Sequence, residues 1–275
     1  MGPDPTNDTT TGTQYLDRPG GRIAFDVTGH GPLLVLSPGM GDVRESFRFL
    51  VPRLVEAGYR VATVDLRGHG DSDTTFDDHG DVPTGTDLLA LVDHLGGPAV
   101  LVGNSMSAGA AAWAAAEDPG AVRALVLLGP FVRQPPSSPV LAIALRLGLL
   151  RPWGPSVWSA YHASLYRGAR PDDLAGHRAR IRTSLARPGA WHAFQATTQT
   201  SHAPVEARLG EVEAPTLVVM GTADPDFPDP EQEARWIADR LAGQVQLVEG
   251  AGHYPHAEFP DLVAPRIVEY LGGVA

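Results

Sequence analysis

Apolar residues occur along the chain in short runs separated by segments of helical periodicity. Six runs are apolar along most of their length, at residues 33–36, 61–64, 100–102, 124–128, 217–220 and 245–248. Strands that are apolar on both faces are typical of a sheet covered by helices on both sides, and such a sheet is usually parallel. Residues 14–17 and 22–28 flank a Pro-Gly-Gly turn, and 22–28 alternates apolar with polar or small positions, so together they predict an opening antiparallel hairpin.

Helical spacing fills the intervals between these runs. Apolar residues recur at helical intervals in segments at 47–55, 88–95, 108–116, 231–241 and 262–271. Strand and helix therefore alternate along the chain. The pattern predicts an α/β fold built on a mostly parallel sheet.

Residues 132–204 depart from this alternation. They contain no strand pattern, but four helical stretches broken by proline, at residues 140–150, 157–166, 172–186 and 191–198. They also hold nine Arg and two Asp, whereas the whole chain has a net charge of −11. We therefore expect residues 132–204 to form a helical lid or cap, inserted into a core made of residues 13–131 and 205–275.

Aromatic residues are concentrated in this expected cap: Trp153, Trp158, Tyr161, Tyr166, Trp191 and Phe194. Apolar side chains mostly build cores, so packing against the core domain is one interpretation. The second interpretation is that some of them line a substrate pocket beneath a lid, and the two are compatible. We expect Trp158, Tyr161 and Phe131 to line that pocket.

Composition excludes several classes of protein. The 275 residues are enough for one substantial core, and the absence of cysteine excludes disulfides, thiolate metal sites and a cysteine nucleophile. All 21 basic residues are Arg, and the net negative charge argues against nucleic-acid binding, since phosphates would be repelled over most of the surface.

The N-terminal residues and the longest uncharged stretch bear on localisation. Residues 1–12 are polar, lack the apolar run of a signal peptide and predict a disordered N-terminal tail. Residues 94–116 carry no formal charge, but their four glycines and one proline rule out an uninterrupted membrane helix. We expect a cytoplasmic protein without a membrane partner, whose oligomeric state the sequence leaves open.

A serine at a predicted strand-to-helix turn is the first candidate for chemistry. Ligand sites in α/β sheets lie at the carboxyl ends of strands. Residues 103–107, Gly-Asn-Ser-Met-Ser, follow such a strand and precede an Ala-rich helix, which would place the hydroxyl of Ser105 above the sheet edge. Gly-x-Ser also ends at Ser72 and Ser156, but neither lies between an apolar strand and a helix. The alternative role for Ser105 is a helix N-cap.

A carboxylate and an imidazole follow the last two predicted strands. Asp224 comes after the run at 217–220, and His253 comes after the run at 245–248 in a Gly-Ala-Gly-His loop. A serine nucleophile needs a base, and the base needs an orienting carboxylate, so these residues predict a triad with Ser105.

Other residues compete for these two roles. Asp226, and less so Asp229, are the alternative acids, and His256 is the alternative base. The acids could equally serve in turns or as helix caps. His256 could be a surface residue or one that supports the site.

Two backbone N–H groups are the candidates for an oxyanion hole. One belongs to Met106, directly after the serine, and the other to Met40 in the Gly-rich loop that follows the run at 33–36. A purely structural turn is the alternative interpretation of this loop.

Taken together, the motifs resemble the α/β-hydrolase family over residues 14–271. The resemblance rests on the loop at 38–41, the stretch at 65–72, the elbow at 103–107, residues 221–224, and Gly252-His253 with Glu258 downstream. It implies an eight-stranded, mostly parallel sheet flanked by helices, a helical cap after strand six, and a Ser105–His253–Asp224 triad that needs no cofactor or metal. The stretch at 65–72 is usually structural in such proteins.

Two positions depart from the family pattern. Ser37-Pro38 stands where many members have His-Gly, and Ser107 replaces the usual glycine of the elbow. Both lie in segments that the resemblance assigns to the catalytic machinery.

The expected activity is acyl transfer. We expect a serine hydrolase, carboxylesterase-like, that cleaves a small, rather apolar ester, lactone or thioester through an acyl-enzyme on Ser105. One alternative is carbon–carbon bond hydrolysis of a ring-cleavage-type diketo acid, because the elbow Gly-Asn-Ser-Met looks like that of such hydrolases. Another is a hydrolase-fold ligand receptor with little turnover. Haloalkane dehalogenase and epoxide hydrolase activities are disfavoured, because the candidate nucleophile is Ser and not Asp.

Overall fold

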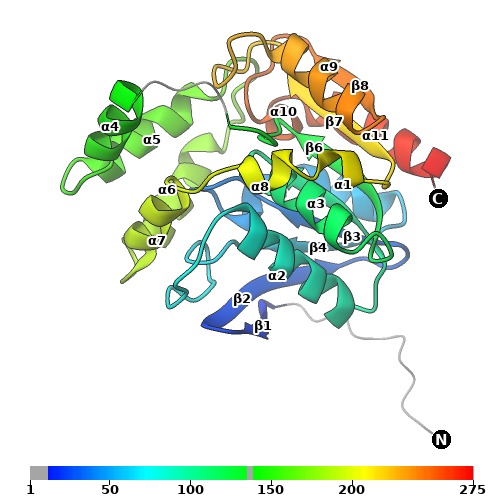
Figure 1. Ribbon diagram of the computed structural model, residues 1–275, viewed down its shortest axis with the longest axis horizontal. Coiled ribbons are helices and arrows are strands. Elements are labelled where there is room, and N and C mark those ends of the chain that lie inside the picture. Colours follow the sequence, from blue (N-terminus) through cyan, green and yellow to red (C-terminus); the bar gives the residue numbers. More distant parts are fainter. Residues whose placement is uncertain (1–11, 135–138, 275) are drawn as a thin grey trace, which may run out of the picture.

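An eight-stranded sheet forms the centre of the computed structural model, which describes residues 12–134 and 139–274 (Figure 1). In spatial order the strands are β1 (Gln14–Arg18), β2 (Gly21–Thr28), β4 (Arg60–Val64), β3 (Leu33–Ser37), β5 (Ala99–Asn104), β6 (Val122–Leu128), β7 (Thr216–Gly221) and β8 (Gln244–Val248). Only β2 runs antiparallel to its neighbours β1 and β4; the remaining pairs are parallel. The predicted mostly parallel sheet is confirmed. The predicted tail lies outside the described residues, apart from Gly12.

Burial along the strands follows their place in the sheet. Every residue of β3, β5 and β7 is buried, as expected for strands covered on both faces. β1 alternates between half-buried and exposed residues, because it lies at the edge and pairs with β2 alone. β2, which was predicted from its alternation, is instead buried at three successive residues, Ile23, Ala24 and Phe25.

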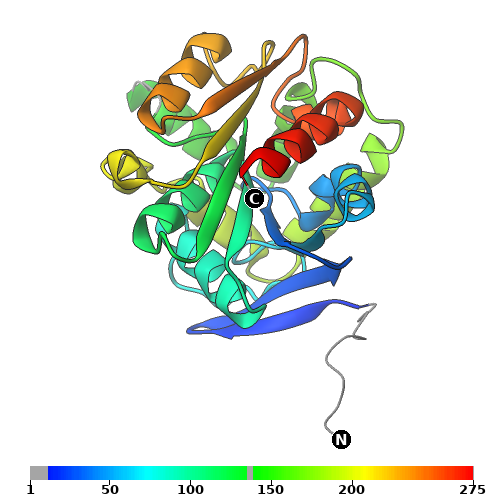
Figure 2. The same ribbon diagram turned by 90° about the vertical axis from the view of Figure 1, so that its right-hand side faces the viewer.

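Two layers of helices cover the sheet (Figure 2). α2 (Asp81–His94), α3 (Met106–Glu117) and α9 (Pro230–Arg240) lie on one face. α1 (Leu50–Glu56) and α11 (Pro260–Val274) lie on the other. Each layer encloses its own apolar core against the strands.

The predicted helix at 47–55 is divided in the structure. A 3-10 turn, η1 (Arg44–Phe47), precedes α1, which begins at Leu50. Pro52 explains the division, since proline lacks an N–H donor and is tolerated in the first turn of a helix but not in its interior. A short helix, α10 (Pro255–Glu258), precedes α11 and was not predicted.

Residues 94–116, the long uncharged stretch, are shared between β5 and α3. Among the residues that the structure describes, no helix combines the length and the apolar character that crossing a membrane requires.

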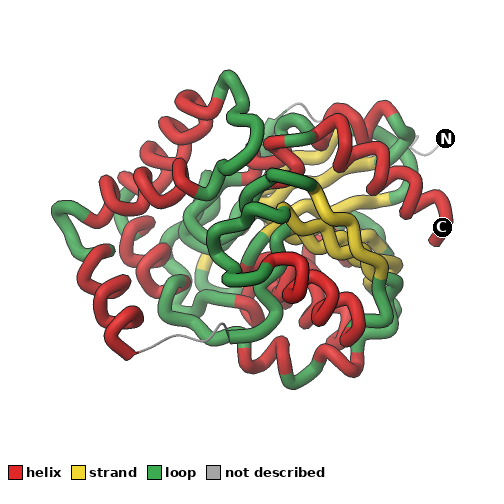
Figure 3. The backbone as a smooth tube through the Cα atoms, turned by 90° about the horizontal axis from the view of Figure 1, so that it is seen from above, coloured by secondary structure: helices red, strands yellow, loops and turns green. Residues whose placement is uncertain are grey.

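The segment between β6 and β7 is helical. It contains α4 (Pro139–Gly148), α5 (Gly154–Ser164), α6 (Leu174–Ala186), α7 (Ala190–Thr197), α8 (Ala203–Glu206) and the 3-10 turn η2 (Leu209–Glu211). Figures 1 and 3 show α4–α7 grouped at one end of the molecule, with a layer of loops between them and the strands. α8 and η2 lie apart from this group, because Val205 and Leu209 are buried in the core beside α3.

The aromatic residues of this segment differ in their environments. Trp158, Trp191 and Phe194 are buried together in an apolar cluster with Val43 and neighbouring aliphatic residues. Trp153 is 52% exposed and fits neither interpretation of these aromatic residues, since it belongs neither to a core nor to the pocket described below. Its indole N–H donates to the carbonyl of Leu147 within the same segment.

Candidate active site

Ser105 occupies a sharp turn between β5 and α3. Its backbone has φ 58° and ψ −126°, a conformation that costs free energy in a residue other than glycine and is typical of functional turns. The surrounding chain holds it there: its N–H donates to the carbonyl of Leu128 over 2.9 Å, and its carbonyl accepts from Phe131 N–H over 3.2 Å. A Cβ at Gly103 would lie 2.4 Å from the carbonyl oxygen of Ser107, so this tight turn requires glycine two residues before the serine.

The elbow is hydrogen-bonded to the loop that follows β3. The hydroxyl of Ser37 donates to that of Ser107 over 3.0 Å, and Ser107 donates to the carbonyl of Pro38. Ser107 is fully buried, so its hydroxyl has no access to water and depends on these partners. Ser37 and Ser107, which both lie where this chain departs from the family pattern, therefore contact each other.

His253 and Asp224 form a buried hydrogen-bonded pair. The Nδ1 atom of His253 lies 2.7 Å from Oδ2 of Asp224, and both residues are 2% exposed. β7 and β8 are neighbours in the sheet, which is why the loops after them bring these two residues together. A carboxylate at Nδ1 keeps a proton on that nitrogen and leaves Nε2 to act as an acceptor.

The electrostatic environment of His253 favours the protonated imidazole. Burial disfavours the charge, but the Asp224 carboxylate outweighs it and, together with Asp226, raises the pKa of His253 to about 9. A base with a raised pKa is a stronger proton acceptor once it is neutral.

Glu258 fixes the loop that carries the imidazole. One of its carboxylate oxygens accepts from Gly252 N–H over 2.8 Å, and the other accepts from the N–H groups of Arg167 and Gly168. The N–H of His253 itself donates to the carbonyl of Leu165 over 2.9 Å. The inserted segment is thereby attached to the loop after β8, within two residues of the imidazole.

Ser105 and His253 line the same cavity, of about 220 Å³. Most of its wall is apolar, and all three residues expected to form a pocket contribute to it: Phe131, Trp158 and Tyr161. The ring of Phe131 meets that of His253 edge-on at a centroid distance of 5.9 Å. A hydroxyl and an imidazole therefore face a space that favours apolar ligands.

The two residues expected to donate to an oxyanion are placed differently. Met40 lines the cavity beside Gly39. Met106 is buried and does not line the cavity with its side chain, but it begins α3, where a backbone N–H has no partner within the helix.

The alternative residues named from the sequence have distinct surroundings. Asp226 lies 3.7 Å from Nδ1 of His253, farther than Asp224, lines the cavity and accepts a hydrogen bond from the hydroxyl of Tyr161. Asp229 is exposed and caps α9 by accepting from Gln232 N–H. His256 is fully buried, so a surface position was wrong; it stacks on Phe47 and contacts the hydroxyl of Ser46 at 3.2 Å.

The stretch at 65–72 takes part in structural contacts. Arg67 forms ion pairs with Asp78 and Asp87, and His69 is fully buried with its Nδ1 atom 2.8 Å from the carbonyl of Arg67. None of the residues of this stretch lines the cavity of Ser105.

A second buried cluster was not predicted from the sequence. Asp42 lies just after the Gly-rich loop, and its two carboxylate oxygens face His177 at 2.8 Å and His162 at 3.6 Å, on α6 and α5. Burial opposes ionisation of Asp42, but the two histidines outweigh it and hold its pKa well below the usual range. The three residues are separated by 120 and 15 positions, so no spacing along the chain could have revealed the cluster.

In the described part of the chain, two groups of residues have the geometry to hold a metal ion. They are Asp42 with His162 and His177, and Asp224 with Asp226 and His253. In each group one histidine nitrogen already contacts a carboxylate oxygen at 2.7–2.8 Å, a contact that accounts for the placement without an ion.

Residues 34–266 match the model of the alpha/beta hydrolase family, and the chain therefore belongs to that family. Its relatives differ in activity. A 2-heptyl-3-hydroxy-4-quinolone dioxygenase of Rhodococcus erythropolis is 28% identical, with 93% of this chain and 90% of the relative aligned. A pimeloyl-[acyl-carrier protein] methyl ester esterase of Neisseria meningitidis is 30% identical (86% and 91%). A 2-hydroxy-6-oxononadienedioate/2-hydroxy-6-oxononatrienedioate hydrolase of Cupriavidus pinatubonensis is 31% identical (82% and 81%).

Proposed function

We propose that the protein is a serine hydrolase that cleaves a small, rather apolar ester, lactone or thioester through an acyl-enzyme on Ser105. The observation that carries this proposal is the shared cavity, in which a serine on a strained turn faces the same space as an imidazole hydrogen-bonded to Asp224. Membership of the alpha/beta hydrolase family and the esterase among the relatives support it.

In the proposed mechanism, His253 removes the proton of the Ser105 hydroxyl as the oxygen attacks the carbonyl carbon of the substrate. Asp224 holds the imidazole in the required tautomer and stabilises its positive charge. The protonated imidazole then donates its proton to the leaving group. Water, activated by the same imidazole, attacks the acyl-enzyme and restores the hydroxyl.

Backbone N–H groups of Met40 and Met106 would stabilise the oxyanion of each tetrahedral intermediate. The hydrogen bonds of Ser37 and Ser107 support this role, because they join the loop that carries Met40 to the elbow that carries Met106. Donors fixed before the reaction need no rearrangement as charge develops, and for that reason they lower the barrier.

We assign residues 132–204 the role of a cap over the active site. The support for this is that Leu149, Trp158, Tyr161 and Leu165 from this segment line the cavity of Ser105. Their apolar side chains favour an apolar acyl or alcohol group in the substrate and exclude water from much of the space around the serine.

Hydrolysis of p-nitrophenyl esters tests the proposal. Ser105→Ala should lower kcat by about 10⁴–10⁶-fold, since the nucleophile is lost. The matched control is Ser156→Ala, which removes the hydroxyl of another Gly-x-Ser sequence on the exposed side of α5 and should leave the rate unchanged. Full turnover by pure Ser105→Ala protein would refute the assignment.

A second candidate function begins with removal of a proton from a substrate hydroxyl by the His253–Asp224 pair, and the serine takes no part in it. A dioxygenase and a hydrolase of oxo-dienedioates are among the relatives, and an imidazole with a raised pKa is able to take a proton from an acidic hydroxyl of a substrate directly. This function would survive Ser105→Ala and be lost in His253→Gln, so the two variants distinguish it from the serine hydrolase.

A further inference from the structure

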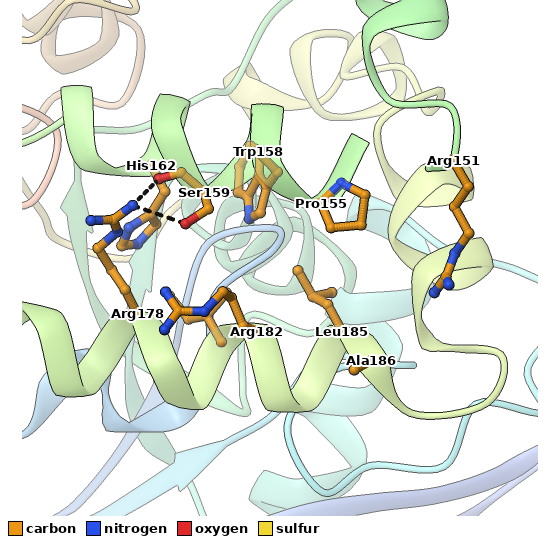
Figure 4. Close-up of a pocket in the computed structure, with 10 residues that line it drawn as sticks. Arg151, Pro155, Trp158, Ser159, His162, Arg178, Arg182, Leu185 and Ala186 are labelled. Carbon is orange, nitrogen blue, oxygen red and sulfur yellow. Dashed lines mark hydrogen bonds between the residues drawn. The ribbon is translucent and has the colours of Figure 1, made fainter. Parts of the chain in front are cut away.

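A second cavity lies between α5 and α6, outside the site of Ser105. It has a volume of about 180 Å³ (Figure 4). Among its lining residues, only Trp158 also lines the cavity of Ser105. It is therefore a separate space behind the wall of the proposed active site.

Of the residues described, three arginines and no acidic residue line this cavity: Arg151, Arg178 and Arg182. Within residues 12–134 and 139–274, none of the three forms an ion pair, whereas ten other arginines do. Figure 4 shows Arg178 and Arg182 rising from α6 toward α5, with Arg151 at the opposite end. The cavity thus holds positive charge that the described part of the protein does not neutralise.

Arg178 contributes a donor that lacks a partner. Its Nη2 atom donates to the carbonyl and to the hydroxyl of Ser159, at 2.7 and 2.8 Å. Its Nε atom is buried and has no hydrogen-bond acceptor among the residues that the structure describes. A buried N–H without an acceptor is costly, and an anion placed beside it would remove that cost.

Apart from Ser159 and His162, the rest of the wall is apolar. Trp158, Ile181 and Leu185 contribute side chains that are less than 10% exposed and belong to one packed cluster. A ligand that suits both parts carries an anionic group for the guanidinium ends and a hydrocarbon portion for the side chains of these three residues.

We propose that this cavity is a binding site for a small amphipathic carboxylate, with its head at Arg178 and Arg182 and its chain against Trp158. The site is independent of the chemistry proposed for Ser105, so either proposal can fail alone. A ligand there contacts Trp158, which separates the two cavities. The indole N–H of Trp158 donates to the carbonyl of Gly41, next to Met40, over 3.2 Å. Occupation of the cavity can thereby influence the loop assigned to the oxyanion.

Calorimetric titration of the full chain with decanoate tests the proposal. The experiment is carried out with the unmodified chain and with Ser105→Ala protein. In the variant, the proposed hydrolysis cannot contribute heat to the titration. Decanoate should bind to both proteins. Decanol lacks the anionic group and acetate lacks the hydrocarbon chain, so each should bind at least about tenfold more weakly.

Arginine variants locate the binding. Arg182→Gln should weaken decanoate binding about tenfold; it removes an exposed side chain without a partner in the described residues, so folding is not at risk. Arg180→Gln is the matched control, on the same helix but outside this cavity, and should change the affinity by less than about twofold. Equal effects of the two variants, equal binding of decanol and decanoate, or no binding of decanoate would each overturn the proposal.

Discussion

Ser37 and Ser107 are joined by a hydrogen bond of 3.0 Å between their side-chain oxygens, with Ser37 as the donor. Ser107 in turn donates to the carbonyl of Pro38. These contacts connect the loop after β3 to the first turn of α3, so the two segments that carry Met40 and Met106 are held in one arrangement. Where the resemblance to the α/β-hydrolase family implies His-Gly and a glycine at the elbow, this chain has two hydroxyl groups that contact each other.

Ser107→Ala removes the hydroxyl that bridges the two segments. We expect kcat to fall about tenfold, the effect of losing roughly 1.4 kcal/mol of transition-state stabilisation, because the loop of Met40 loses its link to the elbow. KM should stay nearly constant, since the cavity wall is unchanged. Steady-state kinetics on a p-nitrophenyl ester measure both. A rise in KM at constant kcat would show that the hydroxyl serves substrate binding instead.

The pH dependence of kcat/KM reports on the imidazole. His253 accepts a proton only when neutral, and neighbouring carboxylates raise its pKa to about 9, so the rate should increase with pH until about that value. Asp226→Asn removes one of the charges that raise the pKa, and the ascending limb should therefore move to lower pH.

Asp229→Asn is the control for this shift, because Asp229 is exposed at the start of α9 and does not contact His253. An ascending limb that stays in place in Asp226→Asn, or moves equally in both variants, would contradict the assigned influence of Asp226.

The Asp42 cluster makes a prediction for stability. Asp42→Asn removes the buried negative charge opposite His162 and His177, and we expect it to lower the free energy of unfolding by about 3–5 kcal/mol. The pKa of Asp42 is lowered in the folded protein, so its contribution is fully present above the unfolded pKa of about 4 and is lost progressively as the pH falls from there toward the lower pKa of the folded state. Urea unfolding at several pH values measures the difference.

His162→Gln should cost less than His177→Gln in the same experiment, because Asp42 is 3.6 Å from the first histidine and 2.8 Å from the second. If Asp42→Asn unfolds at the same urea concentration as the unmodified chain at neutral pH, the cluster contributes no stability and this account of it is wrong.

Much of the fold was predictable because the hydrophobicity of each residue and the periodicity of apolar positions are local properties of the chain. The apolar runs that became β3, β5 and β7 are buried along their whole length, and the glycine and serine pattern around Ser105 specifies a turn that few other residues allow. Residues just past the ends of neighbouring parallel strands lie close together, so the meeting of Asp224 with His253 could also be anticipated.

What could not be predicted depends on contacts between segments that are distant in sequence. His162 and His177 lie on two helices of the insertion and reach Asp42 only through the packing of that segment on the core. The same holds for the cavity of Arg178 and Arg182, since the distance between α5 and α6 does not follow from the periodicity of either helix. The exposure of Trp153, in the turn before α5, is a further case, because large apolar side chains usually pack inward.

The central claim is that the hydroxyl of Ser105 is an activated nucleophile, and covalent labelling tests it most directly. The protein is incubated with a fluorophosphonate, and the site of the adduct is determined by peptide mass spectrometry. We predict one adduct per chain, on Ser105, that is absent in Ser105→Ala and strongly slowed in His253→Gln. Failure to label the folded protein, or an adduct on a different residue that persists in Ser105→Ala, would contradict the account.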